Sequence, residues 1–263
     1  MLRYLLFFTI LIDTARAQDS LTHFNVGVTG NSALNYYGRV DSLHSSAIIP
    51  FIGVSFKNGL YLNTNFVFIH NKLQSEYAAT LVEGGYNFRN KKNSWAGNLS
   101  ATRYFYQDNT DLIQSAVKQS ITVSLTHLNK ILNITLGGDV KFSNQADPGV
   151  QAGLDHIVRW TKVFHKGVVV LDPSAYVYAG TQHFTQTYLQ QKNFLFLPAG
   201  QEELTKEGRQ FSVLSYELSL PVVFAWQKFV FILSPAYVLP QHLLTTDEAK
   251  DLFYTTATVK FTF

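Results

Sequence analysis

Hydrophobic and polar residues alternate one by one in long runs along most of this 263-residue chain. The last run, Leu252 to Phe263, places Phe253, Val259, Phe261 and Phe263 on one side of an extended chain and mostly threonines on the other. Side chains of a β-strand point alternately to its two faces, so this alternation predicts a strand with one apolar face.

Twelve runs of this kind follow residue 17. Most of them reach the ~9 to 11 residues that a tilted strand needs to cross a bilayer, whereas strands of soluble sheets average ~5 to 6 residues. The pattern predicts strands at residues 23–30, 46–57, 60–70, 77–89, 93–106, 116–128, 131–143, 150–160, 166–180, 209–226, 228–239 and 252–263.

The connections between the runs tend to alternate between short and long. An even-stranded membrane barrel has short turns on its periplasmic side and long loops on its outer side, so this order favours such a barrel. Asn58-Gly59 fits a type I′ hairpin turn. The other short turns are predicted at 90–92, 129–130, 161–165 and 227, and the long connections at 31–45, 71–76, 107–115, 144–149, 181–208 and 240–251.

Aromatic residues gather near both kinds of connection. Trp95, Trp160 and Trp226 all lie within a few residues of short turns. Membrane barrels carry aromatic girdles at both membrane interfaces, and a soluble barrel gains nothing from confining its tryptophans to one rim. The short-turn girdle would also contain Phe56, Phe88, Phe224 and Phe229, and the opposite girdle Phe68, Tyr77, Phe105, Phe142 and Tyr237.

The final run resembles the closing strand of bacterial outer-membrane β-barrels, which ends in an aromatic residue. This resemblance implies that Phe253, Val259, Phe261 and Phe263 form a signal for the barrel-assembly machinery. The whole chain looks most like the small outer-membrane barrels of Bacteroidota-type bacteria. The expected fold is therefore an all-β, twelve-stranded antiparallel transmembrane β-barrel in a Gram-negative outer membrane, in contact with lipid and lipopolysaccharide. A soluble β-barrel or sandwich is the alternative.

The start of the chain has the pattern of an export signal. Arg3 precedes an apolar run from Tyr4 to Ile12, and Ala15-Arg16-Ala17 has the small-x-small form of a signal-peptidase site. We expect a cleaved signal peptide at residues 1–17 and a single barrel domain at 18–263. Later windows never reach the ~18 apolar residues of a spanning helix, so strands would have to cross the membrane.

Composition agrees with strands and excludes several kinds of function. The chain has 21 Phe and 14 Tyr but only 15% charged residues, a usage that favours β-structure. Its net charge of +3 implies no nucleic-acid partner. Because there is no cysteine, a disulfide scaffold, thiol catalysis and cysteine metal sites are excluded.

The alternation also predicts which side chains face the lumen. Leu132, Ile134, Leu136, Val140 and Phe142 would face lipid, as would Val117 on the preceding strand. The lumen would be lined by acids at mid-height, Glu83, Asp139, Asp155, Asp172 and Glu217, and by bases nearer the strand ends, Lys118, Lys141 and Arg159. Such residues either fill the lumen as a paired structural network or line a path for ions.

Candidate chemistry is sparse. His156 would face lipid, as in outer-membrane phospholipases, but the neighbouring lipid-facing positions contain no serine. Arg103 would face outward near the outer rim, where it could reach lipid phosphates. No histidines stand at ligand spacing, so we expect no catalytic residue, metal site or cofactor. Several predicted strands contain prolines that a closed sheet resists unless bulges intervene: Pro50, Pro173, Pro221 and Pro235.

The longest connection, residues 181–208, contains the apolar segment Asn193 to Pro198. It would either fold over the mouth of the barrel or bind an extracellular partner. The sequence thus predicts a narrow pore, or a structural membrane protein with a partly filled polar lumen. The alternatives are an enzyme that modifies lipid or lipopolysaccharide, which would need a compact cluster of acid, histidine and hydroxyl, and a hydrophobic-solute transporter or partner-binding barrel.

Overall fold

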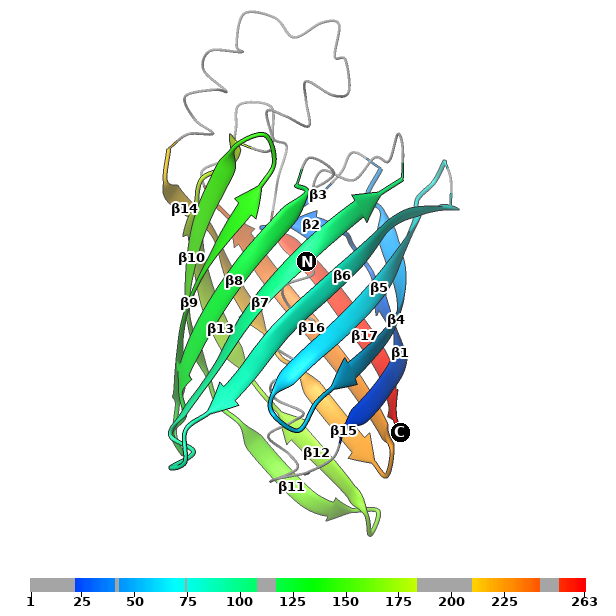
Figure 1. The fold of residues 1–263 in the computed structure, drawn as a ribbon, viewed down its shortest axis with the longest axis vertical. Coiled ribbons are helices and arrows are strands. Elements are labelled where there is room, and N and C mark those ends of the chain that lie inside the picture. The colour runs from blue at the N-terminus through cyan, green and yellow to red at the C-terminus, as the bar shows by residue number, and fades with distance from the viewer. Residues whose placement is uncertain (1–21, 41–42, 74, 108–116, 184–209, 242–250) are drawn as a thin grey trace, which may run out of the picture.

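The computed structural model describes residues 22–40, 43–73, 75–107, 117–183, 210–241 and 251–263. The predicted signal peptide and nearly all of the 181–208 connection lie outside these ranges. The described chain folds into one large antiparallel sheet that closes on itself (Figure 1). A small separate hairpin accompanies it. No helix in these ranges is long and apolar enough to span a membrane.

The strands match the alternating runs closely. The large sheet contains β1 (His23–Asn31), β4 (Ser46–Ser55), β5 (Leu60–His70), β6 (Ser75–Arg89), β7 (Trp95–Tyr106), β8 (Gln119–His127), β9 (Asn133–Phe142), β10 (Ala146–Asp155), β11 (Val158–Val163), β12 (Gly167–Leu171), β13 (Ser174–Gly180), β14 (Ser212–Ser219), β15 (Val222–Trp226), β16 (Phe229–Pro240) and β17 (Leu252–Thr262). The hairpin consists of β2 (Asn35–Tyr36) and β3 (Arg39–Val40).

The first and last strands close the barrel. β1 pairs with β4 on one side and with β17 on the other, and β17 also pairs with β16. β10 and β11 are two segments of one barrel strand, placed end to end along the barrel axis. The same holds for β12 with β13 and for β14 with β15. The sheet is therefore a closed barrel of twelve antiparallel strands, which confirms the predicted fold class.

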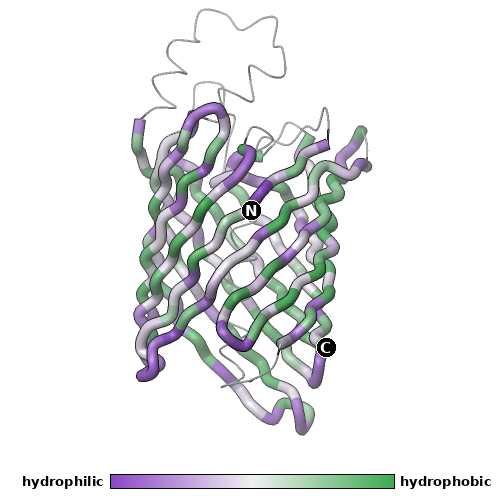
Figure 2. The backbone as a smooth tube through the Cα atoms, in the orientation of Figure 1, coloured by the Kyte–Doolittle hydropathy of each residue, from purple (hydrophilic) through white to green (hydrophobic). Residues whose placement is uncertain are grey.

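The two faces of the sheet differ as the alternation predicts. Leu136 is 61% exposed on the outer face, whereas its neighbours Thr135 and Asp139 are buried in the lumen. Figure 2 shows the same alternation of hydrophobic and hydrophilic positions along the strands. An apolar exterior around a polar interior is the reverse of a soluble protein and is characteristic of membrane barrels.

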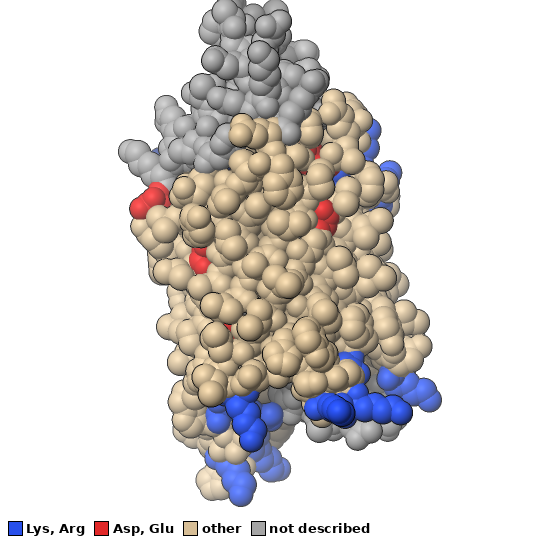
Figure 3. Space-filling view, turned by 90° about the vertical axis from the view of Figure 1, so that its left-hand side faces the viewer, with Lys and Arg blue, Asp and Glu red and all other residues tan. Residues whose placement is uncertain are grey.

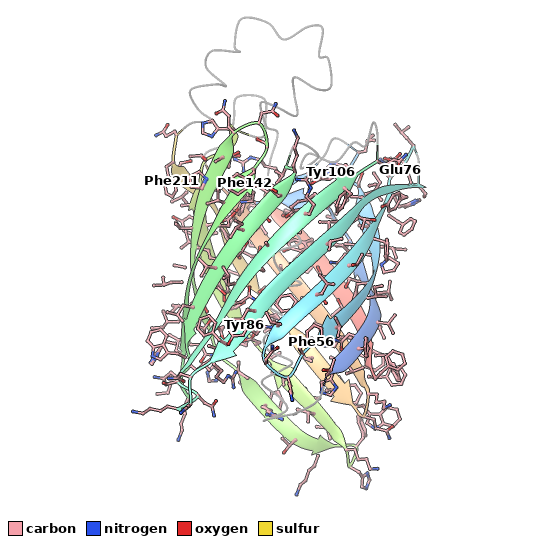
Figure 4. The ribbon with its side chains drawn as sticks, viewed as in Figure 1. Phe56, Glu76, Tyr86, Tyr106, Phe142 and Phe211 are labelled. Atoms are coloured by element: carbon pink, nitrogen blue, oxygen red, sulfur yellow. The ribbon has the colours of Figure 1, made fainter. Side chains whose placement is uncertain are left out.

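Aromatic side chains occupy both ends of this apolar surface. Trp95, Trp160 and Trp226 are 41–48% exposed near the end that carries the short turns. In Figure 4, Phe56 and Tyr86 lie toward the same end, whereas Phe142 and Phe211 lie toward the other. Phe68, Phe105 and Tyr237, predicted for that outer girdle, are 44%, 52% and 38% exposed. The two aromatic girdles expected from the sequence are thus in place.

The turn at Asn58-Gly59 differs from the expected type I′ turn, in which both central residues have positive φ. Only Gly59 has a positive φ, of 92°, and its N–H donates to the carbonyl of Phe56 at 2.9 Å. The turn is therefore a longer hairpin loop with one left-handed residue. The Asn58 side chain accepts a hydrogen bond from the Leu60 N–H at 3.2 Å, which stabilises this alternative.

Three predicted strands, 150–160, 166–180 and 209–226, are wrong as continuous strands because each is broken in two. Proline has no N–H to donate to a sheet, and prolines stand at or beside the breaks. A diagonal line of hydrogen bonds crosses them, in which the first residue of each break donates its N–H to a proline carbonyl of the neighbouring segment: His156 to Pro173, Asp172 to Pro221 and Leu220 to Pro235, at 3.0–3.1 Å. We call this line the proline seam.

Two further expectations fail near the outer end. The connection predicted at 144–149 is short, because β10 already begins at Ala146 and pairs with Phe142 of β9. Val117 was expected to face lipid but is only 2% exposed and packs in the lumen. It precedes β8, so the strand's alternation does not extend to it.

Below the proline seam, β11 and β12 form a hairpin that projects past the rest of the barrel (Figure 1). Among the described strands, β11 pairs only with β12, whereas β12 pairs also with β15. Arg159, Thr161 and Lys162 are exposed on β11. Charged residues on an edge strand discourage edge-to-edge pairing with other chains.

Candidate functional site

The register of the sheet aligns polar residues across the lumen wall. Glu83 on β6 stands opposite Thr102, which stands opposite Ser120, which in turn stands opposite Lys141 on β9. A second row runs from Asn133 through Asp155 to Ser174 and Ser219. Residues in register share a face of the sheet, so these rows line the lumen.

Glu83 is 4% exposed and belongs to a polar cluster on β5, β6 and β7. Thr102 donates its hydroxyl hydrogen to the Glu83 carboxylate at 3.4 Å. The Tyr61 hydroxyl is hydrogen bonded to the same carboxylate and accepts from the Asn98 amide at 3.0 Å. These contacts satisfy the buried acid by neutral groups.

Asp155 and Asp172 lie beside the proline seam and are 7% and 4% exposed. The Asn133 amide donates to Asp155 Oδ2 at 2.7 Å. Asp155 pairs in register with Ser174, two residues after Asp172, so both acids stand on neighbouring segments of the lumen wall.

The remaining lumenal acids have different partners. Glu217 is 4% exposed and accepts a hydrogen bond from the Tyr254 hydroxyl at 3.4 Å. Asp139 is paired with Lys141, whose ammonium lies 2.5 Å from Asp139 Oδ2. All five acids predicted for the lumen are thus buried on its wall, and one of them contacts a predicted lumenal base.

The hairpin of β2 and β3 lies inside the outer part of the barrel, and we call it the lumenal hairpin (Figure 1). Tyr36 and Tyr37 are 7% and 9% exposed. They pack with Val117, Tyr178 and Leu214, which belong to three different parts of the wall. The hairpin therefore reaches across the lumen and fills its outer section.

Polar contacts hold the lumenal hairpin to the wall. The Lys141 ammonium donates to the Tyr37 hydroxyl at 3.4 Å and lies 5.6 Å from the ring centroids of both Tyr36 and Tyr37. On the far side, the Arg39 guanidinium donates to the Gln241 carbonyl at 3.3 Å. Lys141 thus joins a lumenal acid to the hairpin.

Sequence reasoning missed this hairpin, because residues 31–45 were predicted only as a long outer loop. The available signal was Tyr36-Tyr37-Gly38-Arg39, two aromatics followed by a turn-forming glycine. Gly38 has a φ of 84°, in the left-handed region that favours glycine. Alternation over so few residues does not distinguish an inserted hairpin from an exposed loop.

The structure places two predicted lumenal bases elsewhere. Lys118 is exposed and precedes β8, so the strand's alternation does not extend to it. Arg159 is exposed on β11, beyond the proline seam. Odd and even positions point to opposite faces only within one continuous strand. Counting positions across a break therefore no longer predicts which face a side chain is on.

A cluster of acid, histidine and hydroxyl lies at the outer rim, where the sequence analysis expected none. Asp147 is 1% exposed, and its Oδ1 atom accepts from the Thr181 hydroxyl at 2.8 Å and the His183 N–H at 2.6 Å. His183 Nδ1 lies 2.9 Å from the same oxygen. A nucleophile would need its hydroxyl bonded to the imidazole. Here both groups bind the acid, so the cluster anchors the chain that follows β13.

His156 does not stand on a continuous lipid-facing strand as expected. It lies half-buried at the proline seam, and its Nδ1 atom contacts the carbonyl oxygen of Ile131. In the ranges that the structure covers, no three acids or histidines form a group that could hold a metal ion. Arg103 is exposed on the outer face as predicted, with its guanidinium 5.9 Å from the Phe105 ring.

The side chains predicted as an assembly signal lie along the outer face of β17. Phe253 and Phe263 are 65% and 62% exposed, and Val259 is 41% exposed. The ring centroid of Phe261 lies 4.9 Å from that of Phe229 on β16 and 4.8 Å from that of Phe263. Their recognition by assembly machinery remains a prediction.

Comparison with solved structures identifies the fold. The chain is similar to the KdgM porin (TM-score 0.51, 9% identity, 91% of this chain and 99% of that chain). It is also similar to the NanC porin (0.50, 10%, 90% and 98%) and to LpxR from Salmonella typhimurium (0.50, 10%, 91% and 99%). The fold is that of an outer-membrane β-barrel. No family model and no curated protein matches the sequence.

The outer-membrane barrels in this comparison share the fold at identities too low to transfer a function. The Bacteroidota-type resemblance, the lipopolysaccharide contact and an extracellular partner at 181–208 stay predictions. The apolar segment at 193–198 lies outside the described residues. A contact between a hydroxyl and an imidazole occurs at the outer rim, where Ser75 Oγ meets His70 Nδ1 at the turn between β5 and β6. Both side chains are exposed, and the enzyme alternative stays a prediction.

Proposed function

We propose that the chain is a narrow, cation-preferring pore of a bacterial outer membrane, exported with residues 1–17 as its signal peptide, and that the lumenal hairpin is its gate. The membrane barrel fold, shared with two porins, supports a pore. The hairpin fills the outer lumen in the arrangement described, so this arrangement is the closed state.

The observation that carries the proposal is the position of Lys141. Its ammonium is held by Asp139 on the wall and by Tyr36 and Tyr37 on the hairpin. The contacts with the hairpin are non-covalent: a hydrogen bond from a charged group contributes about 1.5–3 kcal/mol and a desolvated cation–π contact up to about 2 kcal/mol. The strands of the hairpin pair with each other and with no other described strand, so the hairpin can leave the lumen without breaking a barrel strand.

The lumenal acids support a preference for cations. Asp155, Asp172 and Glu217 lie on β10 to β14, so they gather on one side of the barrel. A narrow twelve-stranded lumen keeps a passing ion within about 8 Å of that side, the Debye length at physiological salt. Carboxylates that line a narrow path favour cations over anions.

A reversible covalent lock tests the gate. A Cβ atom on Gly38 would lie 3.0 Å from Cγ1 of Val238 on β16, so Gly38→Cys and Val238→Cys would bring their sulfur atoms together. The φ of 84° at Gly38 strains the first substitution, and the reduced double variant carries the same strain without the lock. The natural chain has no cysteine, so no other disulfide competes. In planar bilayers the oxidised double variant should show no conductance steps, and reduction should restore cation-selective steps.

Each single-cysteine variant is the control, because it cannot be locked and should conduct equally under both redox conditions. Equal conductance of the oxidised and reduced double variant would show that the hairpin is not the gate. A variant with residues 33–44 replaced by a short glycine-serine linker addresses the rival function. If it folds and still conducts nothing, the barrel is structural and its lumen is closed by wall side chains.

A further inference from the structure

Every turn at the end opposite the lumenal hairpin carries an exposed lysine. They are Lys57 between β4 and β5, Lys91 between β6 and β7, Lys130 between β8 and β9, Lys166 between β11 and β12, and Lys228 between β15 and β16. We call this ring the basic rim. Exposed arginines and further lysines on the same turns and strand ends add to it.

The basic rim has a single sign of charge. Among the described residues, no Asp or Glu lies on these turns, and the acid nearest the turn between β8 and β9, Asp155, is 7% exposed on the lumen side, opposite Asn133. The exposed or half-buried acids Glu76 and Asp251 lie at the opposite end, together with the bases Lys72 and Lys118. In Figure 3, lysines and arginines gather at the lower end of the visible face, and acidic side chains appear only higher up.

The basic rim adjoins the short-turn aromatic girdle. Trp95 and Trp226 lie next to turns that contain Lys92 and Lys228, and both are 41% exposed. The Lys228 ammonium lies 5.8 Å from the ring centroid of Phe261, a side chain on the outer face of β17. The charge therefore stands outside the wall, at the level where tryptophans mark a membrane interface.

We propose that the basic rim binds the anionic headgroups of phospholipids in the adjacent leaflet, around the whole circumference of the barrel. Basic residues near a membrane surface attract anionic lipids, and long lysine side chains reach from an apolar wall to the headgroups. The inference rests on the membrane-spanning fold and is independent of any pore activity.

The ring shape favours lipid over a macromolecular partner. A folded partner or a cell-wall polymer that docks on one side would be served by bases gathered on one or two turns. Lipid headgroups surround the entire barrel, and bases on all the described short turns match that distribution. The adjoining aromatic girdle fits a lipid interface in the same way.

The tryptophans supply a direct measurement. The chain has only three, Trp95, Trp160 and Trp226, and all lie beside the basic rim. Their fluorescence in vesicles of phosphatidylcholine and phosphatidylglycerol, with one or the other lipid dibrominated as quencher, gives the relative binding constant of the two lipids at this rim. Uniform vesicles make the result independent of protein orientation. We expect roughly fivefold preference for phosphatidylglycerol at low salt.

At about 1 M salt, where the Debye length is about 3 Å, the preference should approach one. A rim variant should also approach one at low salt: Lys57→Gln, Lys91→Gln, Lys130→Gln, Lys166→Gln and Lys228→Gln. The control variant changes bases at the other end, Lys72→Gln, Arg103→Gln and Lys118→Gln, and should keep the preference.

Equal binding of both lipids to the unmodified protein would overturn the proposal, and this measurement requires no variant to fold. A rim variant that folds and keeps the full preference would also overturn it. A third outcome would assign the rim to a cell-wall polymer instead. In that case the unmodified protein would show no lipid preference but would sediment with peptidoglycan sacculi, and the rim variant would not.

Discussion

Single side chains in this barrel can hold two structural units together, and Lys141 is the clearest case. It belongs to the wall, yet its ammonium contacts Asp139 on the same strand and two tyrosines of the lumenal hairpin. Its side chain is 12% exposed and that of Asp139 is 1% exposed. In an ion pair so deeply buried, each partner mainly serves to compensate the charge of the other, and removing one of them leaves a costly buried charge.

Replacing Lys141 with methionine should therefore destabilise the barrel. Methionine keeps most of the packing but removes the cation that compensates the buried Asp139 carboxylate, at a cost of roughly 3–5 kcal/mol. The double variant Asp139→Asn/Lys141→Met should regain most of that loss, because it removes the orphaned charge. Urea unfolding of refolded protein, followed by tryptophan fluorescence, gives both values. Equal stability of the single variant and the parent would show that the pair is hydrated.

At the residue scale, alternation predicted the facing of side chains wherever the strand was continuous. Glu83 and Asp139 lie on unbroken strands and face the lumen as the parity of the sequence indicates. Lys118 and Arg159 fail because one precedes its strand and the other lies beyond a break. The cluster of Asp147, Thr181 and His183 could not be found, because its members are distant in sequence and meet only through strand pairing.

At the scale of elements, the closing strand combines a structural task with a predicted signal. The Phe263 N–H donates to the Phe24 carbonyl at 2.9 Å, which extends the pairing of β17 with β1. Its ring is 62% exposed at the membrane edge. A charged residue near the interface of a barrel costs only about 0–1 kcal/mol, so the ring contributes little to the stability of the finished barrel.

Phe263→Asp should consequently separate assembly from stability. If β17 carries an assembly signal, the amount of folded barrel in the outer membrane should fall several-fold, while the refolded protein loses no more than about 1 kcal/mol. Phe24→Asp is the matched control, since Phe24 is 60% exposed on the adjacent strand at the same end. Cell fractionation and unfolding curves give the two results. If both variants lost a similar amount of folded barrel in the outer membrane, Phe263 would not be part of an assembly signal.

The number of strands and most of their positions followed from alternation, because one buried and one lipid-facing side impose a strict period of two. The proline seam did not follow. A break of one or two residues hardly changes the hydrophobic pattern of an alternating run, so the pattern alone does not reveal it. Pro173 and Pro221 were the available signs of two of the breaks. The lumenal hairpin was missed for a related reason, since its strands contain only two residues each.

On the scale of the whole molecule, charge is sorted along the barrel axis. Bases dominate the short-turn rim, whereas the described acids lie on the lumen wall or toward the outer end. Among the lumenal acids, Asp139 is paired with a base, whereas Asp155 accepts a hydrogen bond from the neutral Asn133 amide and Glu217 from the Tyr254 hydroxyl. The two groups of acids should respond differently to neutralisation.

Changing Asp155, Asp172 and Glu217 together to Asn, Asn and Gln should reduce cation selectivity without lowering the melting temperature. The change removes carboxylates that are buried close together, and burying a charged group costs free energy that a neutral amide avoids. Asp139→Asn should instead lower the melting temperature, because the buried Lys141 ammonium loses the carboxylate that balances its charge. Ion selectivity is measured from reversal potentials in a salt gradient, and the melting temperature from thermal unfolding of the same variants. Anion selectivity of the unmodified barrel, or a triple variant that keeps its selectivity and melts earlier, would mean that these acids fill the lumen instead of lining a path for ions.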